Sequence, residues 1–242
     1  MTKRVVITGL GMVTPLGVGV EKNWQALLQG KSGIGPITRF DVSSFPCRIA
    51  GEVKDFRAKD FLSSKDVRHF DLFVHFAIAS ARMAIEKSGL KVTSENKQRI
   101  GCVTGSGLGG LPNIEFNHKI LLEKGPRRIS PFFIPSIISN MVPGKISIEF
   151  GFMGPTTSIV TACAASSHAI GESFRMIQRG SAEVMITGGS EAVLTPLALG
   201  GFTSMKSLST NNDEPEKASR PFDNERDGFI MSEGGGILVL EE

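Results

Sequence analysis

The sequence predicts an α/β fold in which strands and helices alternate along the chain. Two observations lead to this prediction. Short runs of β-branched and apolar residues recur along the sequence, and the segments between them place apolar residues at helical spacing. Several of the strand-like runs are apolar on both faces, as expected for strands buried between layers of helices.

The order of the elements follows from these patterns. The first clear helix is expected to begin near Ser64, a candidate N-cap, and to end at Gly89, with an apolar stripe between them. A second helix is expected over residues 164–179, stopped by Gly180. Residues 125–135 and 209–227 are expected to be loops. Glycines cluster at or near the strand ends. The expected strands cover residues 4–8, 100–104, 156–161, 182–187 and 236–240.

Composition and charge narrow the class of protein. The 242 residues include 27 Lys and Arg and 24 Asp and Glu, and the net charge of +3 is too small to indicate nucleic-acid binding. Residues 5–8 are too short for the apolar region of a signal peptide, and no run approaches the roughly 18 apolar residues of a membrane span. Cys47, Cys102 and Cys163 are far apart and form no metal or disulfide pattern. A reducing cytoplasm is therefore expected.

Cys163 is the candidate nucleophile. A β-branched run leads into it and a segment of small residues follows, which is typical of a strand, a sharp turn and a helix. A thiol at the N-terminus of a helix lies near the positive end of the helix dipole, which favours the thiolate. Ala162 and Ala164 leave space for a substrate. The alternative is a buried cysteine that acts as a small apolar residue.

A histidine base for Cys163 is not evident. His168 lies five residues further on, which places its side chain about 140° around the helix from that of Cys163. His69, His75 and His118 are on other expected helices, where a surface or core role is the simpler interpretation. The sequence therefore indicates a nucleophile without its usual partner.

Two glycine-rich motifs resemble known sites but lack essential parts. Residues 105–110 read G-x-G-x-x-G, yet no strand with an acidic end follows at the distance that dinucleotide binding requires, since Glu123 precedes a Lys-Gly-Pro-Arg run. A tight turn that brings Leu108 near a substrate is favoured. Residues 188–192 resemble a serine elbow, but no histidine follows Ser190. This turn is expected to pack against the Cys163 turn instead.

Seven segments together resemble the β-ketoacyl-acyl carrier protein synthases, most closely the bacterial type II condensing enzymes of fatty acid synthesis. The resemblance covers the whole chain. The segments are VVITGLGMVTPLG (5–17), SPFFIP (130–135), GP (154–155), TACA (161–164), GGF (200–202), ASRPFD (218–223) and RDGFI (226–230).

The resemblance implies a thiolase-like layered fold made of two similar α/β halves, each a five-stranded mixed sheet covered by helices. Residues 1–242 correspond to the N-terminal β-ketoacyl synthase domain, the first of these halves. In the family, the second half carries two histidines in H-G-T and G-H motifs, and neither motif occurs here. We therefore expect this chain alone to be inactive in the complete reaction.

The resemblance also implies a decarboxylative Claisen condensation. Cys163 would accept an acyl group from acyl carrier protein and donate its backbone N–H to the oxyanion. Malonyl-carrier protein would then extend the chain. No cofactor is implied beyond the phosphopantetheine of the carrier protein. A non-catalytic half-domain or a carrier-protein-binding fragment that needs a second polypeptide is the alternative.

The remaining site residues are also assigned by the resemblance. Lys65, Arg68 and Lys206 would dock the acidic carrier protein, although scattered solvated charge, including Arg127 and Arg128, is the alternative from the residues alone. A homodimer is implied, in which the strand before Cys163 pairs with its copy and Phe133 and Ile134 reach the partner's site. The expected lining of the acyl path consists of Gly107, Leu108, Phe133, Ile134, Ala162 and Phe202.

Overall fold

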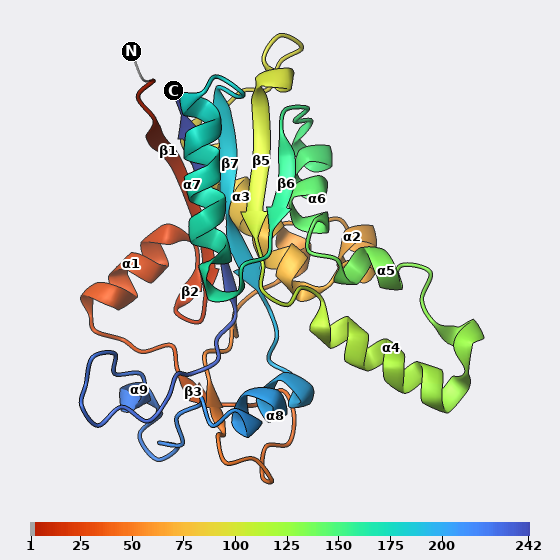
Figure 1. Ribbon diagram of the computed structural model, residues 1–242, viewed down its shortest axis with the longest axis vertical. Helices are drawn as coiled ribbons and strands as arrows, with labels where there is room; N and C mark the ends of the chain where they lie inside the picture. The colour runs from red at the N-terminus through yellow and green to blue at the C-terminus, as the bar shows by residue number, and fades with distance from the viewer. Residues whose placement is uncertain (1–2) are drawn as a thin grey trace.

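A computed structural model describes residues 3–242 and contains a six-stranded mixed sheet with helices on both faces (Figure 1). The strand order is β2-β1-β8-β7-β5-β6. Strands β6, β5 and β7 are parallel, and β8 and β1 continue the sheet in antiparallel pairing. The carboxyl ends of the three parallel strands therefore meet at one edge of the sheet. The strands are β1 (Val6–Thr14), β2 (Gly17–Val18), β5 (Ile100–Gly105), β6 (Thr156–Ile159), β7 (Val184–Glu191) and β8 (Gly234–Glu241).

The mixed sheet covered by helices confirms the α/β class, but the expected number of five strands was wrong by one. The sixth strand, β2, has two residues and pairs with the end of β1 through Val13 and Val18. So short a strand leaves no periodic signal in the sequence. Strand β1 also continues beyond its expected end through Gly9 and Gly11. A Cβ on either glycine would lie well under 3.0 Å from backbone oxygens of the helix behind it, so the two glycines let that helix pack directly on the strand.

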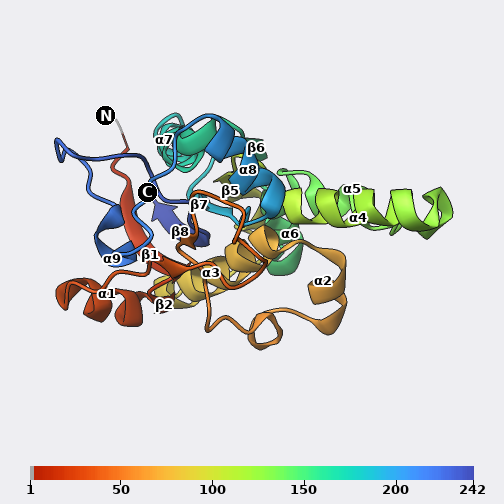
Figure 2. The same ribbon diagram turned by 90° about the horizontal axis from the view of Figure 1, so that it is seen from below.

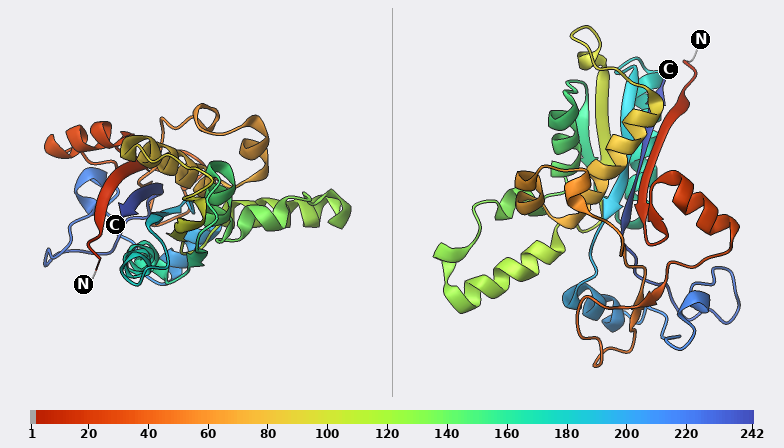
Figure 3. Two further views of the ribbon diagram at one scale, coloured as in Figure 1. Left: turned by 90° about the horizontal axis from the view of Figure 1, so that it is seen from above. Right: turned by 180° about the vertical axis from the view of Figure 1, so that it is seen from behind.

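Helices cover the sheet on both sides. Figure 1 shows α7 in front of the sheet, and the reverse view in Figure 3 shows α3 behind it. Phe73 and Phe76 of α3 are fully buried against the sheet, as is Ile177 of α7 on the opposite face. The helices are α1 (Val20–Leu28), α2 (Ser64–His69), α3 (Leu72–Ser88), α4 (Leu111–Lys124), α5 (Phe133–Ile137), α6 (Met141–Phe150), α7 (Ala165–Gln178), α8 (Pro196–Ser204) and α9 (Pro215–Ala218).

The helix expected from Ser64 to Gly89 is divided into α2 and α3, which is a correction to the prediction. The N-cap of α2 is Ser63, whose side chain accepts from the backbone N–H of Asp66. The chain then leaves helical geometry at Phe70 and Asp71. The buried Asp71 carboxylate accepts from the N–H of Asn113 at the start of α4, 3.1 Å away. Its partner is 42 residues distant, so the local apolar pattern contains no trace of the break.

Other boundaries agree with the prediction more closely. Gly89 ends α3 in a left-handed conformation with φ 70°, and α7 ends just before Gly180. The expected loop at 125–135 is partly wrong, because Pro126–Arg128 forms a 3-10 turn and α5 begins at Phe133. The 209–227 loop contains only the short helix α9.

Two further regions surround the carboxyl edge of the sheet. Below it, α8, α9 and the two-stranded pair β3 (Gly35–Pro36) and β4 (Ile49–Ala50) pack around an apolar cluster that includes Leu199 and Met231. Arg39 joins this region to the start of β8. Its guanidinium forms an ion pair and two hydrogen bonds with the carboxylate of the buried Glu233. Helices α4 and α5 project to one side as an arm (Figure 2).

The first turn of α7 lies directly against the ends of two strands. A Cβ on Gly105, the last residue of β5, would lie well under 3.0 Å from the backbone of Ala165. A Cβ on Gly189 in β7 would overlap Ser166 in the same way. The expected turn at 188–192 is wrong, because residues 188–191 continue strand β7. The expected packing is seen at Gly189, which lies against the helix that follows Cys163. The first glycine of the pair, Gly188, faces β8 instead, with its Cβ position blocked by Gly236.

We expect Gly105→Ala to lower the free energy of unfolding by about 2 kcal/mol or more, because the added methyl group overlaps the backbone of α7. Gly171→Ala is the matched control, since its Cβ would meet no atom within 4 Å and alanine favours a helix interior. Urea unfolding of both variants measures the difference. Equal stability of the two variants would show that α7 is free to move away from the sheet.

Candidate active site

The sequence around Cys163 forms the expected turn between strand and helix. Strand β6 ends at Ile159, residues Ala162–Ala164 make a 3-10 turn, and α7 begins at Ala165. Ala162 has a φ of 50°, in the left-handed region that non-glycine residues rarely occupy. Such strain is typical of residues at functional sites. Cys163 is exposed at the tip of this turn, beside the N-terminus of a 14-residue helix.

The other two thiols are in a different environment. Cys47 and Cys102 are both buried. Burial raises the pKa of both thiols, most strongly that of Cys102, which lies inside β5. A reactive cysteine must be accessible and able to ionise. Cys163 is therefore the cysteine available to a reagent or a substrate.

The backbone N–H of Cys163 is available to a ligand. Its neighbours in the turn are occupied, since the N–H of Ala164 donates to the carbonyl of Thr161 and that of Ala165 to Ala162. Among residues 3–242, the Cys163 N–H itself donates no hydrogen bond. A free N–H beside a nucleophile is the arrangement that stabilises a developing oxyanion.

The four histidines have different surroundings. His168 bonds to the Thr161 hydroxyl through Nδ1, with 2.7 Å between the two atoms. His69 stacks on Phe132 with the ring centroids 3.5 Å apart, and His75 is buried in α3. His118 is exposed on α4. Within the described residues no hydrogen bond joins Cys163 to a histidine.

The turn after β5 lies beside the Cys163 turn. A Cβ on Gly107 would be 3.9 Å from the backbone of Ala162, so the two turns are close neighbours. Leu108 follows and is half exposed. Glu123, the candidate acid for dinucleotide binding, lies inside α4 and not at the end of a strand. The G-x-G-x-x-G pattern therefore forms a tight turn next to the candidate nucleophile.

Glu191 is the residue that the sequence analysis missed. It ends β7, and its carboxylate accepts from the N–H groups of Gly107 and Leu108 at 2.5 and 3.0 Å and from the Ser106 hydroxyl at 3.2 Å. The N–H groups of Gly107 and Leu108 are therefore occupied and cannot serve as oxyanion donors. The neighbouring Ser190 is buried.

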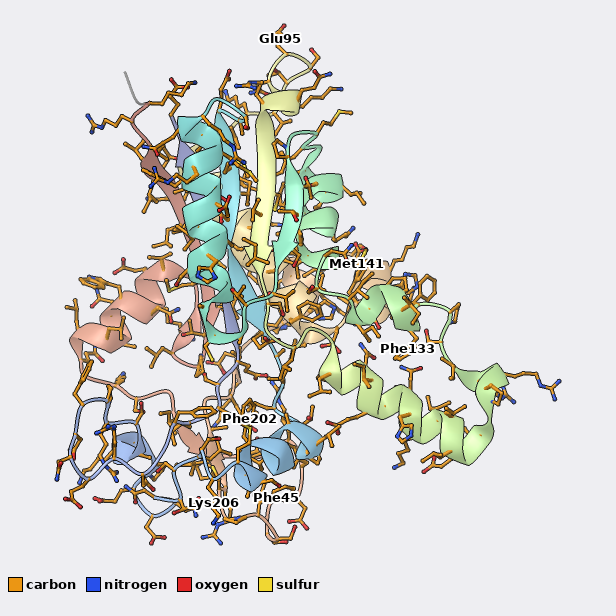
Figure 4. All side chains as sticks on the ribbon, in the orientation of Figure 1. Phe45, Glu95, Phe133, Met141, Phe202 and Lys206 are labelled. Carbon is orange, nitrogen blue, oxygen red and sulfur yellow. The ribbon has the colours of Figure 1, made fainter. Side chains whose placement is uncertain are left out.

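The remaining lining residues are more widely distributed. Figure 4 shows Phe202 on α8 below the sheet and Phe133 on the arm to one side. The Phe202 ring packs edge-on against Phe229, with 5.3 Å between centroids. Ile134 follows Phe133 and is 57% exposed. Of the expected acyl-path residues, the structure thus brings Gly107 and Leu108 to the Cys163 turn, while Phe133 and Ile134 lie on the arm.

The three basic residues occupy two places. Lys65 and Arg68 are exposed on α2, whereas Lys206 follows α8 at the lower end of the molecule (Figures 1 and 4). Lys206 has a φ of 52°. The structure therefore does not bring the three residues together into one patch.

Other kinds of site receive no support in the part of the chain that the structure describes. Residues 3–242 contain no cluster of three or more metal-ligating side chains, and none of their helices is both long and apolar enough to cross a bilayer. A groove of about 600 Å³ between α4 and α8 is lined by residues such as Leu122 and Leu197 but does not include Cys163.

Fold and site together define a class: a thiolase-like α/β protein with a cysteine on a strained turn at the carboxyl edge of its sheet. Residues 2–242 match the family model described as "Beta-ketoacyl synthase, N-terminal domain". The chain therefore belongs to the β-ketoacyl synthase family, and it corresponds to the N-terminal part of its members.

Curated relatives share this family. The chain is 55% identical over 240 residues to a 3-oxoacyl-[acyl-carrier-protein] synthase 2 of Coxiella burnetii, and 52% identical to a protein of the same name from Vibrio cholerae. Each alignment covers 99% of this chain and 58% of the relative. The chain thus spans somewhat more than half the length of these relatives.

Solved structures of ketosynthases have a similar fold. The ishigamide ketosynthase/chain length factor superposes with a TM-score of 0.89 at 31% identity, covering all of this chain and 59% of that one. A type II polyketide ketosynthase, solved in complex with its acyl carrier protein, superposes with a TM-score of 0.83 at 30% identity and the same coverage.

We expect iodoacetamide to alkylate Cys163 of the native chain well before Cys47 and Cys102, because only Cys163 is exposed. Peptide mass mapping after a short exposure identifies the labelled thiol. Unfolding in urea before labelling is the control, since all three thiols then become accessible. Equal labelling of the three cysteines in the native chain would contradict the environment described for Cys163.

Proposed function

We propose that Cys163 is the acylation site of a fatty-acid condensing enzyme. The observation that carries this proposal is the exposed thiol on a strained turn, with its own N–H free and a helix N-terminus behind it. The names of the relatives, 3-oxoacyl-[acyl-carrier-protein] synthase 2, support the reaction class.

The chemistry is a decarboxylative Claisen condensation. The Cys163 thiolate attacks the thioester carbonyl of acyl-carrier protein, and the phosphopantetheine thiol leaves. The tetrahedral intermediate carries an oxyanion to which the N–H of Cys163 donates. Malonyl-carrier protein loses CO₂, and the resulting enolate attacks the acyl-enzyme thioester. The Cys163 thiolate leaves, and the product is 3-oxoacyl-carrier protein. The phosphopantetheine arrives on the carrier protein, so the proposal includes no cofactor bound to this chain.

The acyl chain is proposed to pass along the turn after β5 and toward α8. Gly107 and Leu108 support this path because they adjoin Ala162. Phe202 would line its deeper part from α8. The half-exposed side chain of Leu108 presents apolar surface on the turn that adjoins Ala162, which suits an aliphatic substrate.

A homodimer is proposed to complete each site. Among residues 3–242, strand β6 is at the end of the sheet and bonds only to β5, which leaves its other side unpaired. Free strand edges pair readily with a second strand. Ile134 on the arm is largely exposed, which suits a role in the partner's acyl path together with Phe133.

The enolate step is proposed to need a second half. Among residues 3–242 no hydrogen bond joins a histidine to the thiol, and the family's H-G-T and G-H histidines match nothing in the sequence. The chain is therefore proposed to be an N-terminal domain that accepts an acyl group but does not complete condensation alone. Its three free cysteines support a reducing compartment, which we take to be the cytoplasm.

The alternative function is that of a non-catalytic half-domain that binds carrier protein. It shares the docking surface but predicts no covalent acyl-enzyme. The exposure of Cys163 favours the catalytic proposal, since a binding module has no need of an accessible thiol on a strained turn.

Incubation with acyl-carrier protein should add one acyl group to the 242-residue chain, on Cys163, as measured by intact mass and peptide mapping. Cys163→Ala should abolish the addition, because no other thiol is exposed. Adding malonyl-carrier protein should give no 3-oxoacyl product from the pure chain. Binding without acylation would support the non-catalytic alternative, and full condensation would contradict the need for a second half.

Reversing the charge at the docking residues should weaken binding of the acidic carrier protein. We expect Lys65→Glu and Arg68→Glu each to raise the dissociation constant roughly three- to tenfold at low salt, with the loss shrinking as salt is added. Lys206→Glu tests the second location separately. Lys31→Glu, on the exposed loop after α1, is the control. Equal effects at all four positions would indicate a general charge effect without a docking surface.

A further inference from the structure

Glu191 is a partly buried carboxylate with no basic partner among the described residues. Within residues 3–242 it forms no ion pair. Its carboxylate instead accepts hydrogen bonds from the turn after β5. Oε2 accepts from the N–H groups of Gly107 and Leu108, and Oε1 accepts from the Ser106 hydroxyl. The same hydroxyl accepts from the N–H of Gly109 at 3.2 Å. The turn consists of residues 106–109. One carboxylate therefore holds three of them directly and the fourth, Gly109, through the Ser106 hydroxyl.

Keeping a charge in this position is costly. Burial raises the pKa of Glu191, while the N–H groups of the turn act in the opposite direction. A buried carboxylate is tolerated when donors replace its lost water. A single oxygen that accepts two adjacent N–H groups also fixes the orientation of both peptide planes. Its contacts therefore constrain the turn more tightly than an apolar side chain of similar size would.

The turn lies between Glu191 and the nucleophile. A Cβ on Gly107 would be 2.9 Å from Oε2 of Glu191 on one side and 3.9 Å from the backbone of Ala162 on the other. Ala162 is the strained residue directly before Cys163. Any shift of the turn changes the distance between Leu108 and the thiol.

We propose that Glu191 is a positioning residue that holds the Gly107–Leu108 turn against the Cys163 turn and thereby fixes the apolar wall along which an acyl chain approaches the thiol. The inference rests on the proposed acylation of Cys163. Glu191 does not contact the reacting atoms. It acts through the turn, and it determines how strongly the site prefers a long alkyl chain over a small reagent.

The test compares two thiol reagents of equal chemistry and different length. Rates of Cys163 alkylation are measured with N-ethylmaleimide and with N-dodecylmaleimide on the full 242-residue chain. In the wild type the long reagent reacts faster, because its chain binds along the wall. Glu191→Ala should lower the long-to-short rate ratio roughly tenfold while the N-ethylmaleimide rate stays nearly constant, because a wall displaced by about 1 Å no longer orients the chain.

Two further variants and a control separate positioning from folding. Glu191→Gln keeps an acceptor oxygen for the two N–H groups and should restore most of the ratio. Ser106→Ala removes the hydroxyl link and should give an intermediate loss. Glu172→Ala, an exposed carboxylate on α7, should leave the ratio unchanged. If Glu191→Ala does not fold, seen as labelling of Cys47 and Cys102, the Gln and Ser106 variants decide.

The outcomes are distinct. A wild-type chain with no preference for the long reagent would overturn both the proposed acyl path and this inference. A wild-type preference that persists unchanged in Glu191→Ala and Ser106→Ala would overturn the inference alone. Equal slowing of both reagents in Glu191→Ala, with no rescue by Gln, would also overturn it, because Glu191 would then affect the thiol and not the wall.

Discussion

The contact between the first turn of α7 and the ends of β5 and β7 controls the rest of the site. Gly105 lets the backbone of α7 approach β5, and Gly189 leaves room for the Ser166 side chain of the same helical turn, since a Cβ at either position would overlap these atoms. The approach leaves a short connection between β6 and α7, and the chain closes it through the left-handed Ala162. Cys163 is then displayed at the edge where three parallel strands end. The strain, the exposure of the thiol and the free N–H all follow from one packing constraint.

Two carboxylates in this region accept hydrogen bonds from backbone N–H groups. Glu191 faces N–H groups of the turn after β5, and Asp71 faces the N–H of Asn113. Glu191 ties the end of β7 to the turn after β5, and Asp71 ties the start of α3 to the start of α4. Burial raises the pKa of both groups, that of Asp71 to about 6. These ties make the region around the thiol rigid without a metal ligand cluster among residues 3–242.

Local features could be predicted from the sequence, and long-range partners could not. The Cys163 turn was visible because strand, nucleophile and helix are consecutive, and the end of α3 at Gly89 was visible for the same reason. Glu191 was missed because its partners lie more than 80 residues earlier in the chain. The break between α2 and α3 was missed because Asp71 bonds to α4. Gly9 and Gly11 were expected beyond the end of the first strand, whereas they lie inside β1 and leave room for α3.

The left-handed conformation of Ala162 limits how this position can vary. A methyl group in that conformation costs about 1 kcal/mol, and a β-branched side chain costs considerably more. Glycine would relieve the strain but would let the turn sample other shapes and lose the fixed direction of the thiol. Mutational drift at residue 162 is therefore confined to a few small residues. A position that contributes no chemistry is in this way nearly as restricted as the nucleophile beside it.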